Sequence, residues 1–153
     1  MKEVAFADGQ IRFRIPAGWI EGKEKDGSGA FYDDGRQAGT LRLKLMTFTS
    51  DDNLTGHIAF DELEAMEPEP GQKLEALPNG NALRSHREET VANGERTLFH
   101  VWLLASIDPP HRMRLAVFSF TIANTDENAL EARRTIAALE REIKAAQFSH
   151  QIS

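Results

Sequence analysis

The sequence predicts an α+β fold in which an antiparallel sheet is sandwiched between helices, a three-layer α/β/α arrangement. Residues 96–123 contain two apolar stretches joined by a turn at residues 108–112, where two consecutive prolines cannot donate to a strand ladder. Both stretches have apolar side chains on alternate and intervening positions, and such strands are covered on both faces. Two further segments have helical character, residues 53–66 and 126–147, and we expect one helix on each face.

Length and composition limit the class of protein. A chain of 153 residues is long enough for one core, so we expect a single domain over residues 1–153. The formal charge of -6 argues against nucleic acid and anionic membranes as partners. The absence of cysteine excludes disulfides and thiolate chemistry. Neither a signal-like start nor an apolar run of membrane-spanning length occurs, and this favours a cytoplasmic protein.

The first half of the chain alternates between short strands and turns. Residues 4–6 and 11–15 flank a turn, and the second of these strands alternates strictly between apolar side chains and arginine. Pro16 then interrupts the ladder, and we expect Trp19 to close one end of the core. Two short strands follow around residue 26, and residues 41–45 repeat the alternating pattern.

The second half contains both predicted helices. Ser50 and the acidic pair after it suit the start of a helix over residues 53–66, which Gly56 weakens by about 1 kcal/mol relative to alanine. Strands are expected at residues 74–77 and 82–90, and the second is polar on both faces, as an edge strand or protruding arm would be. Residues 126–147 form an amphipathic helix with a regular apolar stripe.

Three segments carry a resemblance to a known family: Phe13 to Trp19, Gly39 to Leu43, and the closing stretch from Ala129 to Phe148. In this order the chain resembles the PsbP-like α/β/α sandwich superfamily, which includes a photosystem II extrinsic subunit, a Ran-binding import factor and small bacterial proteins. The resemblance implies a binding or adaptor protein without catalytic activity, and some bacterial relatives look like chaperones. No binding residue of the family matches a position in this sequence.

Histidines are the first candidates for chemistry. Five are scattered along the chain without metal-ligand spacing, and only His86 and Glu88 lie two residues apart on one face of a strand. We interpret this pair as an exposed edge-strand pair and expect no metal and no cofactor. His100 shares a strand face with Trp102. It is either a histidine of the core or of the sheet-helix boundary with satisfied hydrogen bonds, which we favour, or a buried histidine with a shifted pKa.

No catalytic residue is predicted. The chain lacks the GxSxG pattern of a serine nucleophile and the glycine-rich loops that bind nucleotides. The pairs Asp33-Asp34 and Asp51-Asp52 fit turns and a helix start better than a general acid and base, because neighbouring residues seldom face one substrate together. We therefore expect that the protein is not an enzyme.

The strongest surface feature is an acidic run along the first predicted helix. It is interpreted as a solvated face, with docking to a basic partner as the alternative. Trp19, Phe31 and Tyr32 are candidate aromatic anchors beside it. The candidate protein-binding surface comprises Trp19, Tyr32, Asp61, Glu62, Glu64 and Glu67. The predicted function is protein binding without catalysis, as an adaptor, chaperone or immunity-type protein. The alternative is a small-molecule binder or enzyme with a pocket between the sheet and the first helix, and the oligomeric state, monomer or dimer, is open.

Overall fold

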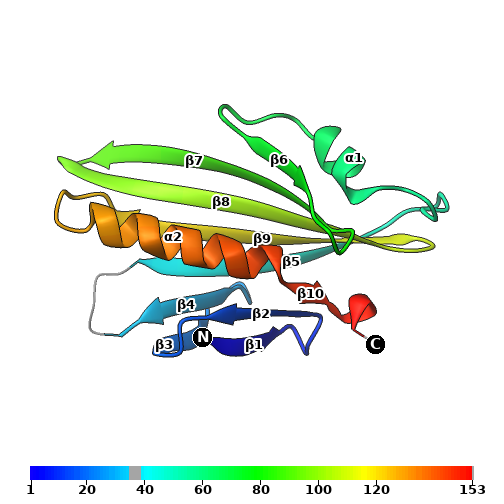
Figure 1. Ribbon diagram of the computed structural model, residues 1–153, viewed down its shortest axis with the longest axis horizontal. Coiled ribbons are helices and arrows are strands. Elements are labelled where there is room, and N and C mark those ends of the chain that lie inside the picture. Colours follow the sequence, from blue (N-terminus) through cyan, green and yellow to red (C-terminus); the bar gives the residue numbers. More distant parts are fainter. Residues whose placement is uncertain (35–38, 153) are drawn as a thin grey trace.

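The computed structural model describes residues 1–34 and 39–152, and these residues form two antiparallel sheets with two α-helices. The smaller sheet has the order β1-β2-β10, with bounds Lys2–Phe6, Ile11–Ile15 and Gln147–Phe148. The larger sheet has the order β3-β4-β5-β9-β8-β7-β6 (Figure 1). Its strands are Trp19–Lys23 (β3), Gly29–Asp33 (β4), Thr40–Thr49 (β5), Lys73–Ala76 (β6), Ala82–Ala92 (β7), Glu95–Asp108 (β8) and Arg112–Ala123 (β9). The helices are α1 (Ala59–Glu64) and α2 (Ala129–Lys144), and a short 3-10 helix, Ser149–Gln151, follows β10.

The inner face of the larger sheet carries the main core. The strand register places Trp102 opposite Phe118, and Phe118 opposite Leu43. All three side chains are fully buried, because α2 and the smaller sheet cover this face. The N-terminal hairpin, β1 and β2, is not part of the larger sheet. Instead β1 and β2 form a second layer, in which Phe13 packs edge-on against Phe118 with ring centroids 5.2 Å apart.

The outer face of the larger sheet is covered only at one end. Ala59 and Leu63 of α1 pack there against Ala105 and Leu115, and all four side chains are buried. Farther along β8 and β9 the side chains on this face are only half-buried: Phe99, Val101, Leu103 and Val117. The fold class is confirmed, but the two covers are unequal.

The first helix is much shorter than the predicted span of residues 53–66. The polar side chains before it bond locally: Ser50 Oγ accepts from the Asp52 amide at 3.1 Å, and Asn53 Oδ1 accepts from the Thr55 amide at 2.9 Å. Such side chains hold turns rather than helix interiors. Gly56 follows with a φ of +86°, which ends any helical path, so α1 begins only at Ala59.

The remaining predictions agree closely with the structure. The helix expected over residues 126–147 is α2, and Thr125 is bonded to Asn128 Oδ1 ahead of its start. β7 pairs with β6 only from Ala82 to Ser85, so its polar second half extends beyond β6 as an edge. Within the described ranges, no helix combines the length and the apolar character needed to cross a membrane.

Candidate functional site

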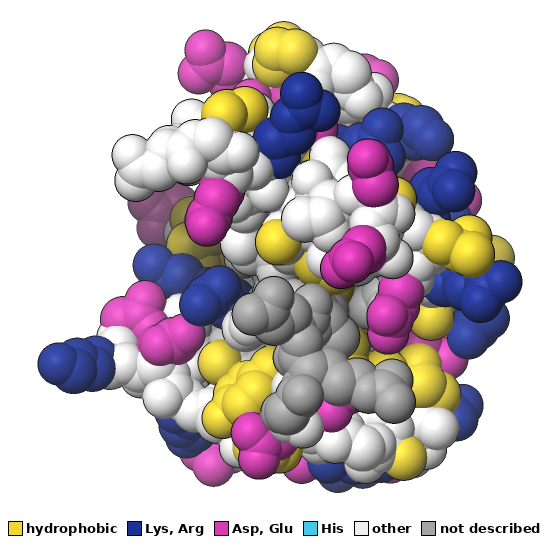
Figure 2. All heavy atoms as spheres, turned by 90° about the vertical axis from the view of Figure 1, so that its left-hand side faces the viewer, with side chains coloured by type: hydrophobic (Ala, Val, Ile, Leu, Met, Phe, Trp, Pro, Cys, Tyr) yellow, Lys and Arg dark blue, Asp and Glu magenta, His cyan; other side chains and the backbone are white. Residues whose placement is uncertain are grey.

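Negative charge is concentrated in one part of the chain, residues 50–72, here called the acidic lobe. It comprises α1 and the loops on either side of it, and contains seven aspartates and glutamates but neither lysine nor arginine. The lobe therefore carries -7 of a chain total of -6, and the remaining residues sum to +1. Figure 2 shows the end of the molecule away from α1, where acidic and basic side chains are interspersed. The lobe thus stands apart from the rest of the surface.

Most of the predicted acidic residues are available for contact. Glu62 is paired with His57, whose Nδ1 lies 3.2 Å from its Oε1. Asp61, Glu64 and Glu67 are exposed and take part in no ion pair within the described part of the chain. Two large apolar side chains accompany them, Ile58 with 58% and Met66 with 37% of its surface exposed.

The two aromatic residues of the candidate surface lie elsewhere. Trp19 is 6% exposed and stacks on Phe120 at a centroid distance of 6.3 Å, so it belongs to the inner core and does not reach the surface. Tyr32 is half-buried on β4, whose partners in the sheet are β3 and β5, whereas α1 covers the other end of the sheet. The structure therefore separates both aromatic residues from the carboxylates of α1.

Among the described residues, the interface between the sheet and the first helix is packed where the alternative function calls for a pocket. Leu63 is 0% exposed and Ala59 is 2% exposed, and both fill this interface against the sheet. A close-packed contact of this kind leaves no room for a ligand.

A hollow that includes His100 lies on the opposite face, beside α2. Its volume is about 400 Å³, and it lies between the middle of β7, the middle of β8, the start of β6 with Gly71 before it, and one side of α2. His100 stacks on Trp102, with ring centroids 4.3 Å apart. Trp102 in turn donates from Nε1 to Glu140 Oε1 at 3.1 Å. We call this hollow the His100 pocket. The sequence predicted a pocket only at the first helix, not beside α2.

His100 is half-buried at the boundary between the sheet and α2. Both ring nitrogens are buried and have no hydrogen-bond partner among the described residues. Burial lowers the pKa of His100 to about 4; Glu140 opposes this effect, while the positive groups nearby reinforce it, namely Arg87, His86 and Lys73. The lowered pKa agrees with the alternative expectation. His100 does lie at the boundary between the sheet and a helix, as favoured, but its ring nitrogens lack the hydrogen bonds that were expected there.

A metal-ligand set forms around His86. Glu69 joins the predicted pair of His86 and Glu88, and the ligand atoms of the three residues lie within 4.8 Å of one another. Sequence spacing does not predict Glu69 as a member of this set, because it lies in a loop 17 residues before His86. His86 Nε2 already lies 3.4 Å from Glu88 Oε1, so direct contact between these two side chains accounts for their proximity without a metal ion.

A serine and a histidine also meet near the C-terminus. Ser106 Oγ lies 3.0 Å from His150 Nε2, and the other ring nitrogen faces the Arg114 guanidinium at 3.4 Å. A nucleophile of this kind needs an accessible hydroxyl and an acceptor on the second ring nitrogen. Ser106 is 2% exposed and Arg114 is a donor, so this arrangement fixes the C-terminus instead.

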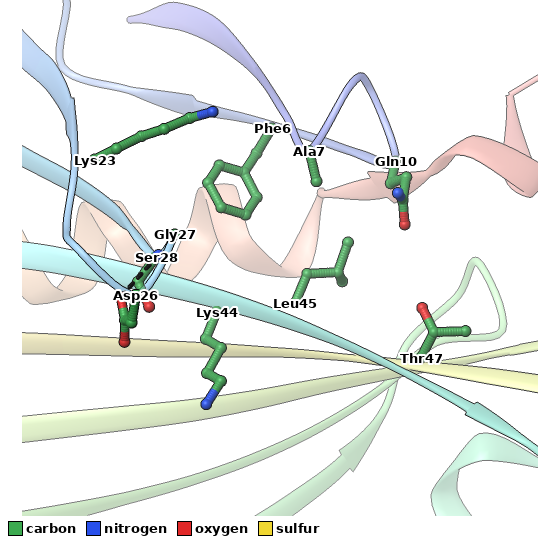
Figure 3. Close-up of a pocket in the computed structure, with 10 residues that line it drawn as sticks. All are labelled: Phe6, Ala7, Gln10, Lys23, Asp26, Gly27, Ser28, Lys44, Leu45 and Thr47. Atoms are coloured by element: carbon green, nitrogen blue, oxygen red, sulfur yellow. Dashed lines mark hydrogen bonds between the residues drawn. The ribbon is translucent and has the colours of Figure 1, made fainter.

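A second surface hollow of about 380 Å³ lies between the β1–β2 turn, the β3–β4 turn and β5 (Figure 3). Phe6 and Leu45 point into it, whereas the side chains of Lys23 and Lys44 point away from one another. Asp26 accepts from the Ser28 amide at 2.9 Å, which lowers its pKa and holds it in the turn. No set of polar groups converges here.

The architecture defines the fold class of the protein: it is an α+β sandwich in which helices cover an antiparallel sheet. Three solved structures share this fold with the chain. Protein Mog1, as its E65A mutant, is 16% identical, with a TM-score of 0.55 and coverage of 96% of this chain and 95% of the other. LpqN of Mycobacterium tuberculosis, which is involved in cell envelope biogenesis, is 11% identical, with a TM-score of 0.57 and coverage of 95% and 88%.

A protein of Bacteroides thetaiotaomicron VPI-5482 is 15% identical, with a TM-score of 0.65 over 96% of this chain, which spans 48% of the length of that protein. No protein-family model and no curated protein sequence matches the chain. At these levels of identity the likeness establishes the fold alone, and the function has to be argued from the residues of this chain.

Proposed function

We propose that this chain is a non-enzymatic protein-binding protein whose acidic lobe docks on a basic surface of its partner. The observation that carries the proposal is the separation of charge: -7 lies within residues 50–72 and +1 is spread over the rest. A field of one sign on one part of the surface speeds the encounter with an oppositely charged protein and disfavours like-charged ones.

The lobe also has the composition of a contact surface. Ile58 and Met66 are exposed apolar side chains beside the unpaired carboxylates of Asp61, Glu64 and Glu67. Protein interfaces commonly combine an apolar centre, which contributes much of the affinity, with a charged rim that sets orientation. Ile58 and Met66 are therefore the expected anchors.

The lobe is held firmly enough to present these groups. Leu63 is fully buried against the sheet, and Leu54 just before α1 donates its amide to the Pro110 carbonyl of the β8–β9 turn at 2.6 Å. An adaptor, a chaperone or an immunity-type protein would each need such a preformed surface. A cytoplasmic location stays a prediction from the sequence.

Charge reversal on α1 tests the proposal. The double variant D61K/E64K should lose capture of a basic partner, whereas D126K/E127K, with the same change in net charge at exposed positions before α2, should retain it. The captured protein would be identified by mass spectrometry, purified, and titrated against both variants at 50 and 200 mM salt. We expect weaker binding at the higher salt concentration.

A third variant, Ile58→Ser, separates apolar contact from charge. It should weaken binding at both salt concentrations without changing the salt dependence. Equal binding of one purified partner to both charge-reversal variants, or a partner with an acidic surface, would refute the acidic lobe as the docking site.

A further inference from the structure

Basic side chains outnumber acidic ones among the described residues that line the His100 pocket. Three basic side chains line it from three elements: Lys73 from β6, Arg87 from β7 and Arg133 from α2. None of the three takes part in an ion pair or a hydrogen bond with another described residue. The strand register supports their convergence, because Arg87 lies directly opposite His100 and Lys73 directly opposite Ser85, on the face that α2 covers.

The acidic group of the pocket is already engaged. Glu140 accepts the Trp102 indole N–H at 3.1 Å, and its second oxygen lies 3.9 Å from Lys144 Nζ. Three cations and one carboxylate give the pocket a formal charge of +2. Glu140 is the single carboxylate among the described lining residues, and Glu69 and Glu88 lie beside His86 at the rim. An anion from solution would therefore meet three exposed basic side chains at this pocket.

His100 makes the pocket sensitive to an anion. Its imidazole is buried without hydrogen-bond partners and is kept neutral by burial and by the surrounding cations. A bound anion would offset the field of Arg87 and Lys73, which favours the protonated imidazole. The ring would therefore report occupancy even without touching the ligand.

We propose that the His100 pocket binds a small phosphate-bearing molecule. Arg87 and Arg133 donate hydrogen bonds to the phosphate oxygens, and Lys73 contributes a third positive charge. Arginine suits this role because its planar fork matches two oxygens at once. A phosphate monoester carries about -1.5 to -2 near neutral pH, which balances the charge of the pocket. A volume of about 400 Å³ admits a small organic molecule, and Ile136 and Ala137 of α2 offer an apolar wall for the rest of it.

The proposed phosphate-binding side chains are distinct from the proposed docking residues: Lys73, Arg87 and Arg133 line the pocket beside α2, whereas α1 packs on the outer face, and only Gly71 at the end of the acidic lobe reaches the pocket. Variants in the acidic lobe should therefore leave phosphate binding unchanged. Conversely, loss of phosphate binding would leave docking by the lobe intact.

Nuclear magnetic resonance with inorganic phosphate and pyrophosphate as probes tests the proposal. We expect saturable shifts at the His100 ring and the Trp102 indole N–H, and a higher His100 pKa at saturation. R87Q/R133Q should weaken binding at least tenfold, while Arg134→Gln, a neighbouring exposed arginine that does not line the pocket, should not.

A single substitution tests the proposal even if the double variant R87Q/R133Q does not fold. Lys73→Gln alters an exposed side chain on the edge strand β6, and it should weaken binding several-fold. Shifts that chloride reproduces at equal ionic strength, or an equal loss of binding in Arg134→Gln, would overturn the proposal.

Discussion

Replacement of His100 by phenylalanine should make the ligand-free protein more stable. The wild-type ring buries two nitrogen atoms without partners, and a buried polar atom without a hydrogen bond costs about 1–3 kcal/mol. Phenylalanine has no such atoms and keeps an aromatic ring for stacking on Trp102. Its extra volume would project into the adjoining pocket. We expect the free energy of unfolding at pH 7 to rise by about 1 kcal/mol.

The same variant should alter the dependence of stability on pH. The folded protein holds the pKa of His100 at about 4, below the ordinary value of 6.5. Between these values the unfolded chain binds a proton that the folded chain does not, so wild-type stability is full above pH 6.5 and falls as the pH drops toward 4. The difference between the two pKa values sets an upper bound of roughly 3 kcal/mol on the stability lost through His100 at low pH. Partial solvent access to the ring reduces the expected loss to about 1–2 kcal/mol.

Urea unfolding at pH 7.5 and pH 4.5 measures both effects. His100→Gln provides the matched control, because glutamine cannot titrate but still buries polar atoms. We expect both variants to lose the extra pH dependence and only His100→Phe to gain stability at pH 7.5. The reasoning is refuted if wild type and His100→Gln lose the same stability between the two pH values.

Two further predictions concern the core. Leu139 is 1% exposed on α2, so Leu139→Ala should lower the free energy of unfolding in urea by about 2–5 kcal/mol. Leu130 is 52% exposed on the same helix, and Leu130→Ala should lower it by less than about 0.5 kcal/mol. Similar losses in the two variants would mean that α2 is peripheral. Gly39 and Gly80 both have a φ of +90°, but a Cβ at Gly39 would lie 2.5 Å from Phe120 Cζ and one at Gly80 would meet nothing within 4 Å. Gly39→Ala should therefore reduce the free energy of unfolding by about 1–3 kcal/mol more than Gly80→Ala. Thermal unfolding checks this, and equal melting temperatures of the two variants would contradict this account.

The sequence predicted the fold through patterns that depend on local chemistry. Apolar side chains on both faces of residues 96–123 indicated a central hairpin, and β8 and β9 lie in the middle of the larger sheet. The regular stripe of residues 126–147 predicted α2 to within three residues at each end. The length of α1 was overestimated because the acidic pair after Ser50 resembles a helix start, whereas the serine side chain caps a turn instead.

The candidate sites depend on contacts that no local pattern shows. Lys73, Arg87 and Arg133 are far apart in sequence, and only the pairing of β6 with β7 and the packing of α2 bring them to one hollow. Glu69 joins His86 in the same way. Charge, by contrast, was visible in the sequence, because the acidic residues of the lobe are neighbours along the chain.

The second half of β7 has a consequence for how copies of this protein behave at high concentration. Beyond Ser85 the strand offers backbone donors and acceptors on its open side, where a strand from another molecule would be able to add. Arg87, Glu88 and Glu89 are exposed there, and pairing with a second copy in register would bring like charges together. The polar character of this segment therefore protects an unfinished sheet from growing into an aggregate.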